Sequence, residues 1–167
     1  MSLYVSRNRE FHRPFEPIRL DSYYTAAYWS KQFDLEAKDR ENGQGIRWLL
    51  SLKEEPDSVL GVMGFNHIVR GAFQACYLGF MLDQGFQGQG LMKEALEAGI
   101  KYVFEEMGLH RVMANHLVDN HRSAGLLSRL GFEKEGVAKD YLRINGKWQD
   151  HVLTSKRNLA WEPDFNS

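Results

Sequence analysis

A glycine-rich stretch, "DQGFQGQGLM", joins an apolar segment ending near Leu82 to a helical pattern that starts near Gly90. The free N–H groups and the positive dipole end of a helix start bind anions, and glycine lets a ligand approach the backbone. No Lys-Ser or Lys-Thr follows, which argues against a P-loop, and the spacing of Gly85, Gly88 and Gly90 does not fit the dinucleotide fingerprint. The stretch predicts either a cradle for another anionic ligand or a plain strand–helix turn.

The other reactive side chains offer little metal or thiol chemistry. No pair among the six histidines has the spacing of a helical zinc site, and the single cysteine, Cys76, excludes an internal disulfide and a cysteine-based zinc cage. At the centre of a predicted strand, Cys76 is expected to be a small buried hydrophobe. We therefore expect no metal.

Length and composition limit the class of protein. The 167 residues fit one domain spanning 1–167, and a hydrophobic content of 43% is enough for a packed core. A formal net charge of -1 provides no basic field for nucleic acid, and there is neither a membrane-length apolar run nor a secretory signal. We expect a cytoplasmic protein without direct contacts to nucleic acid or membrane.

Hydrophobic periodicity predicts a mixed α/β domain with one central sheet flanked by helices. The helix after Gly90 is the clearest, with apolar residues recurring at three- and four-residue steps from Met92 to Met107. Asp119 or Asn120 caps a second helix. Helices are predicted over 4–12, 22–40, 46–52, 90–107 and 119–130, and strands over 58–69, 73–82, 110–118, 132–144 and 148–155, the last two joined by an "NGK" hairpin turn.

Two motifs carry a resemblance to a known family. "QGQGLM" from Gln87 and "NHRSAGLLSRLGF" from Asn120 resemble the Gcn5-related N-acetyltransferase (GNAT) superfamily, whose acetyl-coenzyme A loop reads Gln/Arg-x-x-Gly-x-Gly/Ala. Met92 departs from the last position of that loop. "NHIVRGAFQACYLGFML", "HRVMANHL" and "INGKWQDHVLT" narrow the resemblance to the RimJ-like branch, over about residues 11–163.

The resemblance implies a function and a cosubstrate. The RimJ-like branch moves the acetyl group of acetyl-CoA to the N-terminal alanine of a ribosomal protein by direct attack, without a covalent enzyme intermediate. Other acceptors stay open: a small amine, an amino acid or an antibiotic. A further alternative is a non-catalytic, ribosome-associated factor that binds coenzyme A.

The resemblance also implies which residues bind the cosubstrate. The backbone of β-strand residues before the loop would pair with the pantetheine arm, and the loop amides would cradle the pyrophosphate. The start of the second helix would complete the site. The implied binding residues are Phe80, Met81, Leu82, Gln87, Gly88, Gln89, Gly90, Leu91, Met92, Asn120 and Ser123.

The catalytic residues are less clearly indicated. The superfamily often has a tyrosine seven residues after the helix-opening Asn, but Leu127 stands there, and Ser123 is expected to donate a hydrogen bond to the leaving thiolate instead. Asp140 is the first choice for the general base. Tyr141 is either a pocket wall or the missing acid. The rivals of Asp140 are Glu16, Asp150 and His151.

The start of the chain differs from the family pattern. The usual first strand is expected to be missing, since "MSLYVSRNREF" does not match it and Met1 looks like an altered start. The strand at 58–69 would then be a bare edge, which favours pairing with another chain. We expect a monomer, or a homodimer formed through that edge.

Overall fold

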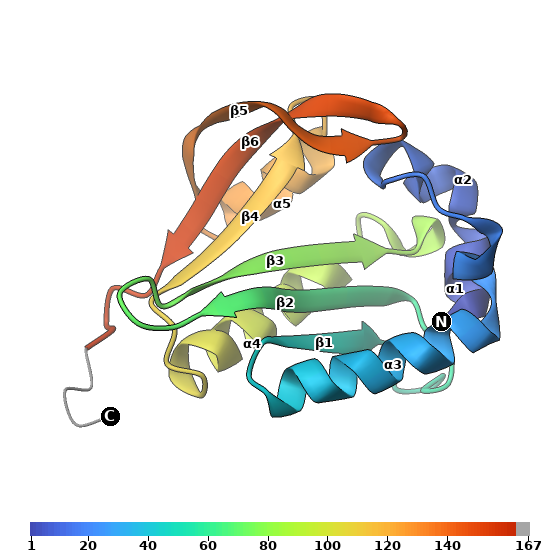
Figure 1. Cartoon of the computed structure of the whole chain (residues 1–167), viewed down its shortest axis with the longest axis horizontal. Helices are drawn as coiled ribbons and strands as arrows, with labels where there is room; N and C mark the ends of the chain where they lie inside the picture. The colour runs from blue at the N-terminus through green and yellow to red at the C-terminus, as the bar shows by residue number, and fades with distance from the viewer. Residues whose placement is uncertain (163–167) are drawn as a thin grey trace.

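The computed structural model describes residues 1–162, which form one six-stranded sheet with helices on both faces (Figure 1). The strand order is β1-β2-β3-β4-β6-β5. No helix within these residues is long and apolar enough to cross a membrane. The strands are β1 (Gly45–Leu50), β2 (Gly61–Val69), β3 (Ala75–Leu82), β4 (Arg111–Leu117), β5 (Glu133–Ile144) and β6 (Lys147–Arg157). The α-helices are α1 (Ser2–Arg7), α2 (Arg9–His12), α3 (Ala26–Glu41), α4 (Leu91–Glu105) and α5 (His121–Arg129), and 3₁₀ turns span η1 (Arg13–Phe15), η2 (Asp21–Tyr24) and η3 (Gln84–Phe86).

The main core lies between the sheet and the face formed by α4 and α5. The apolar side of α4, including Leu96 and Val103, packs on sheet residues such as Phe65. This burial follows from the three- and four-residue periodicity of α4, which places Met92, Leu96, Ile100 and Val103 on one face. A second cluster of aromatic residues packs α1 and α3 on the opposite face; its buried members are Tyr4, Val5, Tyr23, Trp29 and Val62.

The parallel pairing of β3 with β4 is short. It runs only from Ala75–Arg111 to Tyr77–Met113, while β4 stays paired with β6 as far as Leu117–His151. Past Tyr77 the two strands diverge, and Figure 1 shows the gap widening toward the ends of both arrows. The sheet is therefore split in its middle, between two halves that are each well paired.

Most of the predicted elements are confirmed, but the helix predicted over 46–52 is wrong. This stretch is β1, whose residues pair antiparallel with β2 from Gly45–Asn66 to Leu50–Gly61. A short apolar run such as "IRWLLSL" has too few residues to separate helical from strand periodicity, so pairing with β2 decided its structure.

The predicted bare edge is therefore also wrong. β2 lies between β1 and β3, so the edge strand is β1 instead. The segment from 1 to 44, which precedes β1, contains helices and 3₁₀ turns and no strand. The argument for a homodimer through the edge of β2 no longer applies, because the chain covers that edge itself.

A buried carboxylate ties the N-terminal helices to the loop after β3. Asp83 accepts hydrogen bonds from Arg7 Nε (2.5 Å), Asn8 Nδ2 (2.9 Å) and the Gly85 amide (2.9 Å), and the buried Asn8 side chain also accepts one from the Gln84 amide (2.9 Å). Burial raises the pKa of Asp83, but the hydrogen bonds from Asn8 and Arg7 outweigh it and lower the pKa overall. The ionised carboxylate thus holds α1 against the start of the glycine-rich loop.

Asp83→Asn should destabilise the fold by about 1.5–3 kcal/mol at pH 7, the usual size of a lost hydrogen bond to a charged group. The folded-state pKa of Asp83 lies below its unfolded value of about 3.9, so its stabilising effect is present above that value. The effect begins to be lost below the unfolded value and is gone once the pH has fallen through the folded-state pKa, so the gap between wild type and variant should already be narrower at pH 3 than at pH 7. Urea unfolding at pH 7 and pH 3 measures both.

Asp57→Asn is the matched control, because Asp57 is exposed and has no ion pair within the described residues. Its free energy of unfolding should stay within about 0.5 kcal/mol of wild type. A variant gap for Asp83→Asn that is equally large at pH 3 would show that its charge is not what stabilises the loop.

Candidate functional site

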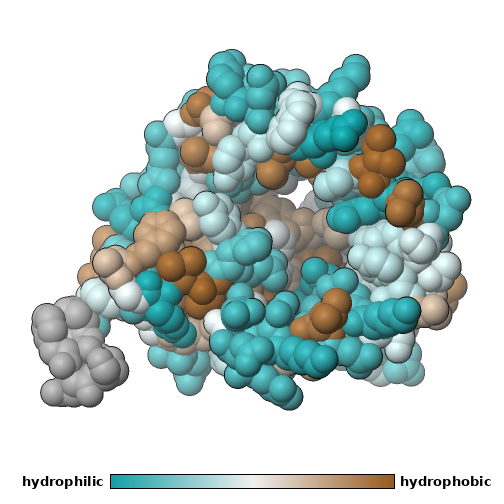
Figure 2. Space-filling view, in the orientation of Figure 1, coloured by the Kyte–Doolittle hydropathy of each residue, from teal (hydrophilic) through white to brown (hydrophobic). Residues whose placement is uncertain are grey.

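A pocket occupies the gap between the diverging strands. Its cavity of about 170 Å³ has room for a small reacting group and not for a whole nucleotide cofactor. Figure 2 shows the sheet face hollowed at this place, between the N-terminal helices and the β5–β6 hairpin. The lining residues come from all parts of the chain: His12, Phe15, Glu16, Leu78, Gly79, Phe80, Met81, Asn115, His116, Leu117, Asn120, Ser123, Leu127 and His151.

The loop from β3 to α4 presents a row of free amides. Gly88 and Gly90 have φ of +76° and +81°, a left-handed conformation that only glycine adopts readily, and Gly90 is the N-cap of α4. Within the described residues, the N–H groups from Gly88 to Lys93 have no protein acceptor. With the positive end of the 15-residue helix behind them, they form an anion site.

The Gln87 side chain holds this loop in place rather than pointing to a ligand. Its Nε2 donates to the carbonyl oxygens of Leu82 (2.9 Å) and Asp83 (3.3 Å). His12 Nε2 also lies 3.0 Å from the Leu82 oxygen, so the end of β3 is fixed from two sides.

The backbone of β3 is available inside the gap. The Asp83 amide donates to Leu60 O on the β2 side, so the alternation of a strand directs the backbone groups of Leu78, Phe80 and Leu82 to the β4 side. Pairing with β4 ends at Tyr77, which leaves Leu78 and Phe80 without a strand partner there. A ligand lying in the gap can pair with β3 as an additional strand would.

The start of α5 faces the same gap. Asn120 is the N-cap, as one of the two sequence alternatives predicted, and its Oδ1 accepts a hydrogen bond from the Ser123 amide at 3.2 Å. Both residues line the pocket, together with Leu127 one turn further along the helix. The Ser123 hydroxyl has no hydrogen-bond partner among the described residues, so it is free to donate to a bound group.

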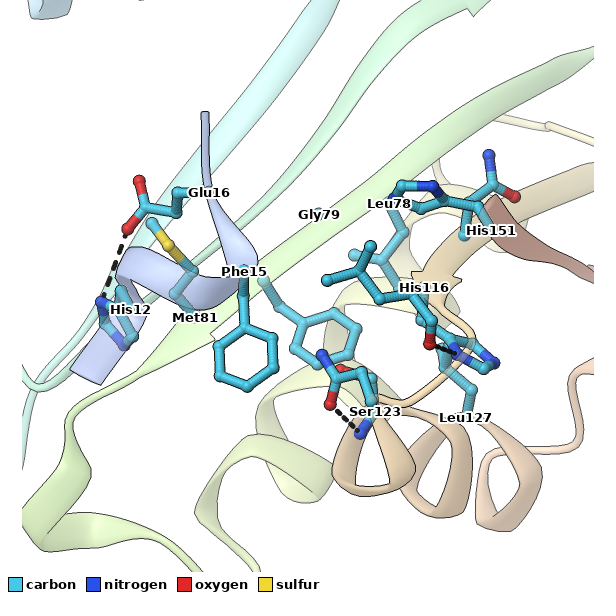
Figure 3. Close-up of a pocket in the computed structure, with 14 residues that line it drawn as sticks. His12, Phe15, Glu16, Leu78, Gly79, Met81, His116, Ser123, Leu127 and His151 are labelled. Atoms are coloured by element: carbon cyan, nitrogen blue, oxygen red, sulfur yellow. Dashed lines mark hydrogen bonds and ion pairs between the residues drawn. The ribbon is translucent and has the colours of Figure 1, made fainter. Parts of the chain in front are cut away.

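A carboxylate lines the pocket on the opposite side. The side chain of Glu16 is 14% exposed; its Oε2 accepts from Arg19 Nε (3.1 Å), and its Oε1 lies 3.8 Å from His12 Nδ1. Figure 3 shows Glu16 and His12 on one side of the pocket and His116 and His151 on the other. The backbone around Glu16 is anchored, because the Asn145 amide of the β5–β6 turn donates to Glu16 O at 2.8 Å.

Two buried histidines form the other wall. The Nδ1 atoms of His116 and His151 each lie 2.9 Å from a backbone oxygen, of Leu117 and of Gln149 respectively. A backbone carbonyl oxygen only accepts, so Nδ1 is the donor in both of these hydrogen bonds. The Tyr141 ring packs against His151 in a tilted arrangement, with centroids 5.6 Å apart and an interplanar angle of 55°.

Tyr141 contacts the lining residue Asn115: the Asn115 Nδ2 donates a hydrogen bond to the Tyr141 hydroxyl at 3.2 Å. Burial, and next the hydrogen bond with Tyr77, raise the pKa of Tyr141. Its phenol therefore stays protonated at neutral pH. Tyr141 lies behind the lining residue Asn115 and outside the pocket lining itself.

The structure separates the four proposed bases. Glu16 and His151 line the pocket, whereas Asp140 and Asp150 do not. Asp140 is exposed at a bulge of β5, with φ +46°, and its amide donates to Asp150 Oδ1 (3.0 Å). Asp150 Oδ2 pairs with Lys139 Nζ at 2.6 Å, which first of all lowers the pKa of Asp150.

The sequence interpretation missed His12 and Asn115. His12 lies in the "FHRPFEP" stretch, whose aromatic residues and prolines were a usable signal, while Asn115 sits in an ordinary strand and carried none. The Cys76 thiol is fully buried, and burial raises its pKa to about 12, so it packs as a small hydrophobe. Among residues 1–162, no group of three His, Cys, Asp or Glu side chains is arranged to hold a metal ion.

Comparison with known proteins gives the family. A model of the acetyltransferase (GNAT) domain matches residues 2–133. The chain is 44% identical over 160 residues to [ribosomal protein uS5]-alanine N-acetyltransferase of Escherichia coli K12, covering 96% of this chain and 82% of that protein. It is 36% identical over 157 residues to the probable N-acetyltransferase YjcK of Bacillus subtilis, covering 92% and 84%.

Solved structures of acetyltransferases have the same fold as this chain. The ribosomal-protein-S5-alanine acetyltransferase of Vibrio fischeri superposes with a TM-score of 0.93 at 36% identity, covering 97% of this chain and 88% of that one. RimJ of Mycobacterium smegmatis, solved in complex with CoA-disulfide, has the same fold, with a TM-score of 0.87 at 24% identity and coverage of 93% and 75%. The split sheet, the glycine-rich helix start and these matches together show that the chain belongs to the GNAT family of acetyltransferases.

Proposed function

We propose that this protein transfers the acetyl group of acetyl-CoA to the N-terminal alanine of a ribosomal protein. The observation that carries the proposal is a pocket that joins the unpaired edge of β3 to Glu16, with the free amides of the loop from Gly88 to Lys93 following the end of that same strand. The E. coli relative named for uS5-alanine acetylation, 44% identical to this chain, supports the choice of acceptor. A ribosomal acceptor would place the reaction in the cytoplasm.

The residues at the helix start fit a pyrophosphate. The amides from Gly88 to Lys93 have no acceptor among the described residues, and a Cβ added at Gly88 or Gly90 would meet no protein atom within 4 Å, so there is open space beside these two glycines. The unpaired backbone of Phe80 suits the amide-rich pantetheine arm. Asn120 and Ser123 line the same pocket as Phe80, which suits a thioester bound beside that strand.

The chain's own groups account for the proton movements. When bound, acetyl-CoA supplies a thioester, an activated acyl group. The acceptor amine forms the new N–C bond as the C–S bond breaks, and Glu16 accepts the proton that the amine releases. The Ser123 hydroxyl donates a hydrogen bond to the departing sulfur, and the Phe80 N–H donates to the carbonyl oxygen as it becomes negative.

The fixed loop around Glu16 supports this role. A free α-amine has a pKa of about 8, so part of it is already unprotonated near neutral pH. For the remaining ammonium form, the base has to remove one proton to give the nucleophilic amine. Arg19, His12 and the backbone bond to Asn145 hold Glu16 in one position at the edge of the pocket. Preorganised placement of this kind reduces the entropy cost of the reaction.

A mass-spectrometric assay tests the proposed acceptor. The protein is incubated with acetyl-CoA and peptides beginning with Ala, Ser or Met, and with an N-terminally blocked peptide that contains lysine. Acetylation of the free N-terminal Ala peptide well above the others is expected. Acetylation of lysine alone would point to another acceptor class, and binding of acetyl-CoA without any transfer would favour a non-catalytic factor.

Gly90→Ala should weaken acetyl-CoA binding about tenfold or more, equivalent to about 1.4 kcal/mol. An alanine at φ +81° is strained by roughly 1–2 kcal/mol, and relieving that strain turns the amides of the α4 start away from the ligand. Calorimetric titration measures the Kd. Gly43→Ala is the control, since φ is +65° there with equally open surroundings; it should lose similar stability and keep wild-type affinity.

Glu16→Gln should lower kcat about 100-fold or more at pH 7. The loss should shrink above pH 8, because the α-amine then loses its proton to solvent without a base. Rates from pH 6.5 to 9.5 check this. Glu10→Gln, which removes an exposed carboxylate paired with Arg13 in the same segment, should leave kcat unchanged. A pH-independent loss would argue that Glu16 is not the base.

A further inference from the structure

Two glycines face each other across β2 and β3 beside the pocket. Gly64 pairs with Gly79 in the middle of this antiparallel ladder. On β3 the neighbours Leu78 and Phe80 belong to the core side with α4, so Gly79 faces the opposite side of the sheet. This is the side on which Val62 and Met81 pack against the N-terminal helices.

Gly79 is exposed although it lies in a central strand and lines the pocket. A Cβ built on it would meet nothing within 4 Å, and its φ is not in the left-handed region, so neither packing nor backbone geometry requires glycine. Glycine weakens the interior of a strand, and where it is not needed for the fold it commonly marks a close approach of another backbone.

The glycine pair forms the floor of a strip with two walls; this floor is exposed at Gly79 and covered at Gly64, which is buried beneath the Asn66 side chain. On one side lie Val62 and Met81, covered by the aromatic cluster of α1 and α3. On the other side lie Asn66 and Tyr77, which pair with each other two residues further along the ladder and so share the face of the glycines. The strip leads directly to the pocket, since Gly79 and Met81 line it.

The side of the strip formed by Asn66 and Tyr77 has unused hydrogen-bonding groups. The Asn66 side chain lies over the floor, with its Nδ2 3.2 Å from the position of a Cβ on Gly64. Within the described residues its amide makes no hydrogen bond, so both a donor and an acceptor are free. A peptide backbone is the partner that uses one of each.

We propose that this strip binds the acceptor polypeptide just after its N-terminal residue, and that Gly79 determines specificity for a polypeptide over a small amine. The backbone of the acceptor would cross the exposed floor at Gly79, with the Asn66 amide, which covers the neighbouring Gly64, pairing to it. A β-branched side chain at 79 would occupy that path, and its Cβ would meet no protein atom within 4 Å. The inference rests on the proposed function and adds a determinant of the substrate class.

Gly79→Val tests the proposal with a series of acceptors: alaninamide, an Ala-initiated dipeptide amide and an Ala-initiated hexapeptide amide. In wild type, kcat/KM should rise with length. In Gly79→Val the rise should disappear, with at least a tenfold loss for the hexapeptide, mainly in KM, and less than a twofold change for alaninamide. The Kd for acetyl-CoA and the Tm should be preserved or, for the Tm, raised, because valine favours strands.

Gly136→Val is the matched control, since Gly136 lies in β5 with equally open surroundings, outside the pocket lining. It should keep the wild-type length dependence. Asn66→Ala provides a second variant and should lose part of the length dependence without any change at Gly79.

The outcomes separate the two proposals. If wild type acetylates the peptides and Gly79→Val keeps their length dependence, this inference is overturned and the proposed function stands. If Gly79→Val loses all acceptors equally, or loses acetyl-CoA affinity, Gly79 serves the cosubstrate and the inference is again wrong. If wild type acetylates no N-terminal Ala peptide, the proposed function itself fails.

Discussion

The short parallel pairing between β3 and β4 is the constraint on which the site depends. Because the two strands separate after Tyr77–Met113, the middle of a continuous sheet contains backbone that no strand satisfies. Unpaired backbone in a protein interior is costly, so such a gap persists only where the surrounding structure holds it open and a ligand or water can use it. In this protein the antiparallel ladders β2–β3 and β4–β6 hold the two sides apart.

The N-terminal segment turns this gap into a pocket with two distinct sides. Asp83 and Asn8 fix α1 to the loop after β3, and the Asn145–Glu16 bond joins the following segment to the β5–β6 turn. The Arg122 guanidinium also lies 5.5 Å from the Phe11 ring centroid, which links α2 to α5. The loop amides and the start of α5 thus lie on one side, and Glu16 and the open strip of sheet on the other.

Sequence reasoning was most successful where the relevant interactions are local. The helix after Gly90 and its glycine-rich start were predicted because a 3.6-residue period and helix-start chemistry are both written in adjacent residues. It failed at β1, a six-residue apolar stretch whose structure is set by pairing with β2. That error also led to the wrong prediction that β2 is an edge strand. Once β1 is recognised as a strand, β1 is the outermost strand of the sheet at that side and β2 is internal.

The sequence by itself determined the family resemblance, the helix start that can hold an anion, and Asn120 and Ser123 as pocket candidates, since each depends on residues only a few positions apart. Only the tertiary structure distinguished among the carboxylates. Asp140 and Glu16 are 124 positions apart in the sequence, and both are ordinary acidic residues in their local context. Strand alternation and the bulge of β5 turn Asp140 to solvent, whereas the anchored N-terminal segment brings Glu16 into the gap. Which carboxylate meets the pocket is decided by packing between distant segments, and no local pattern records it.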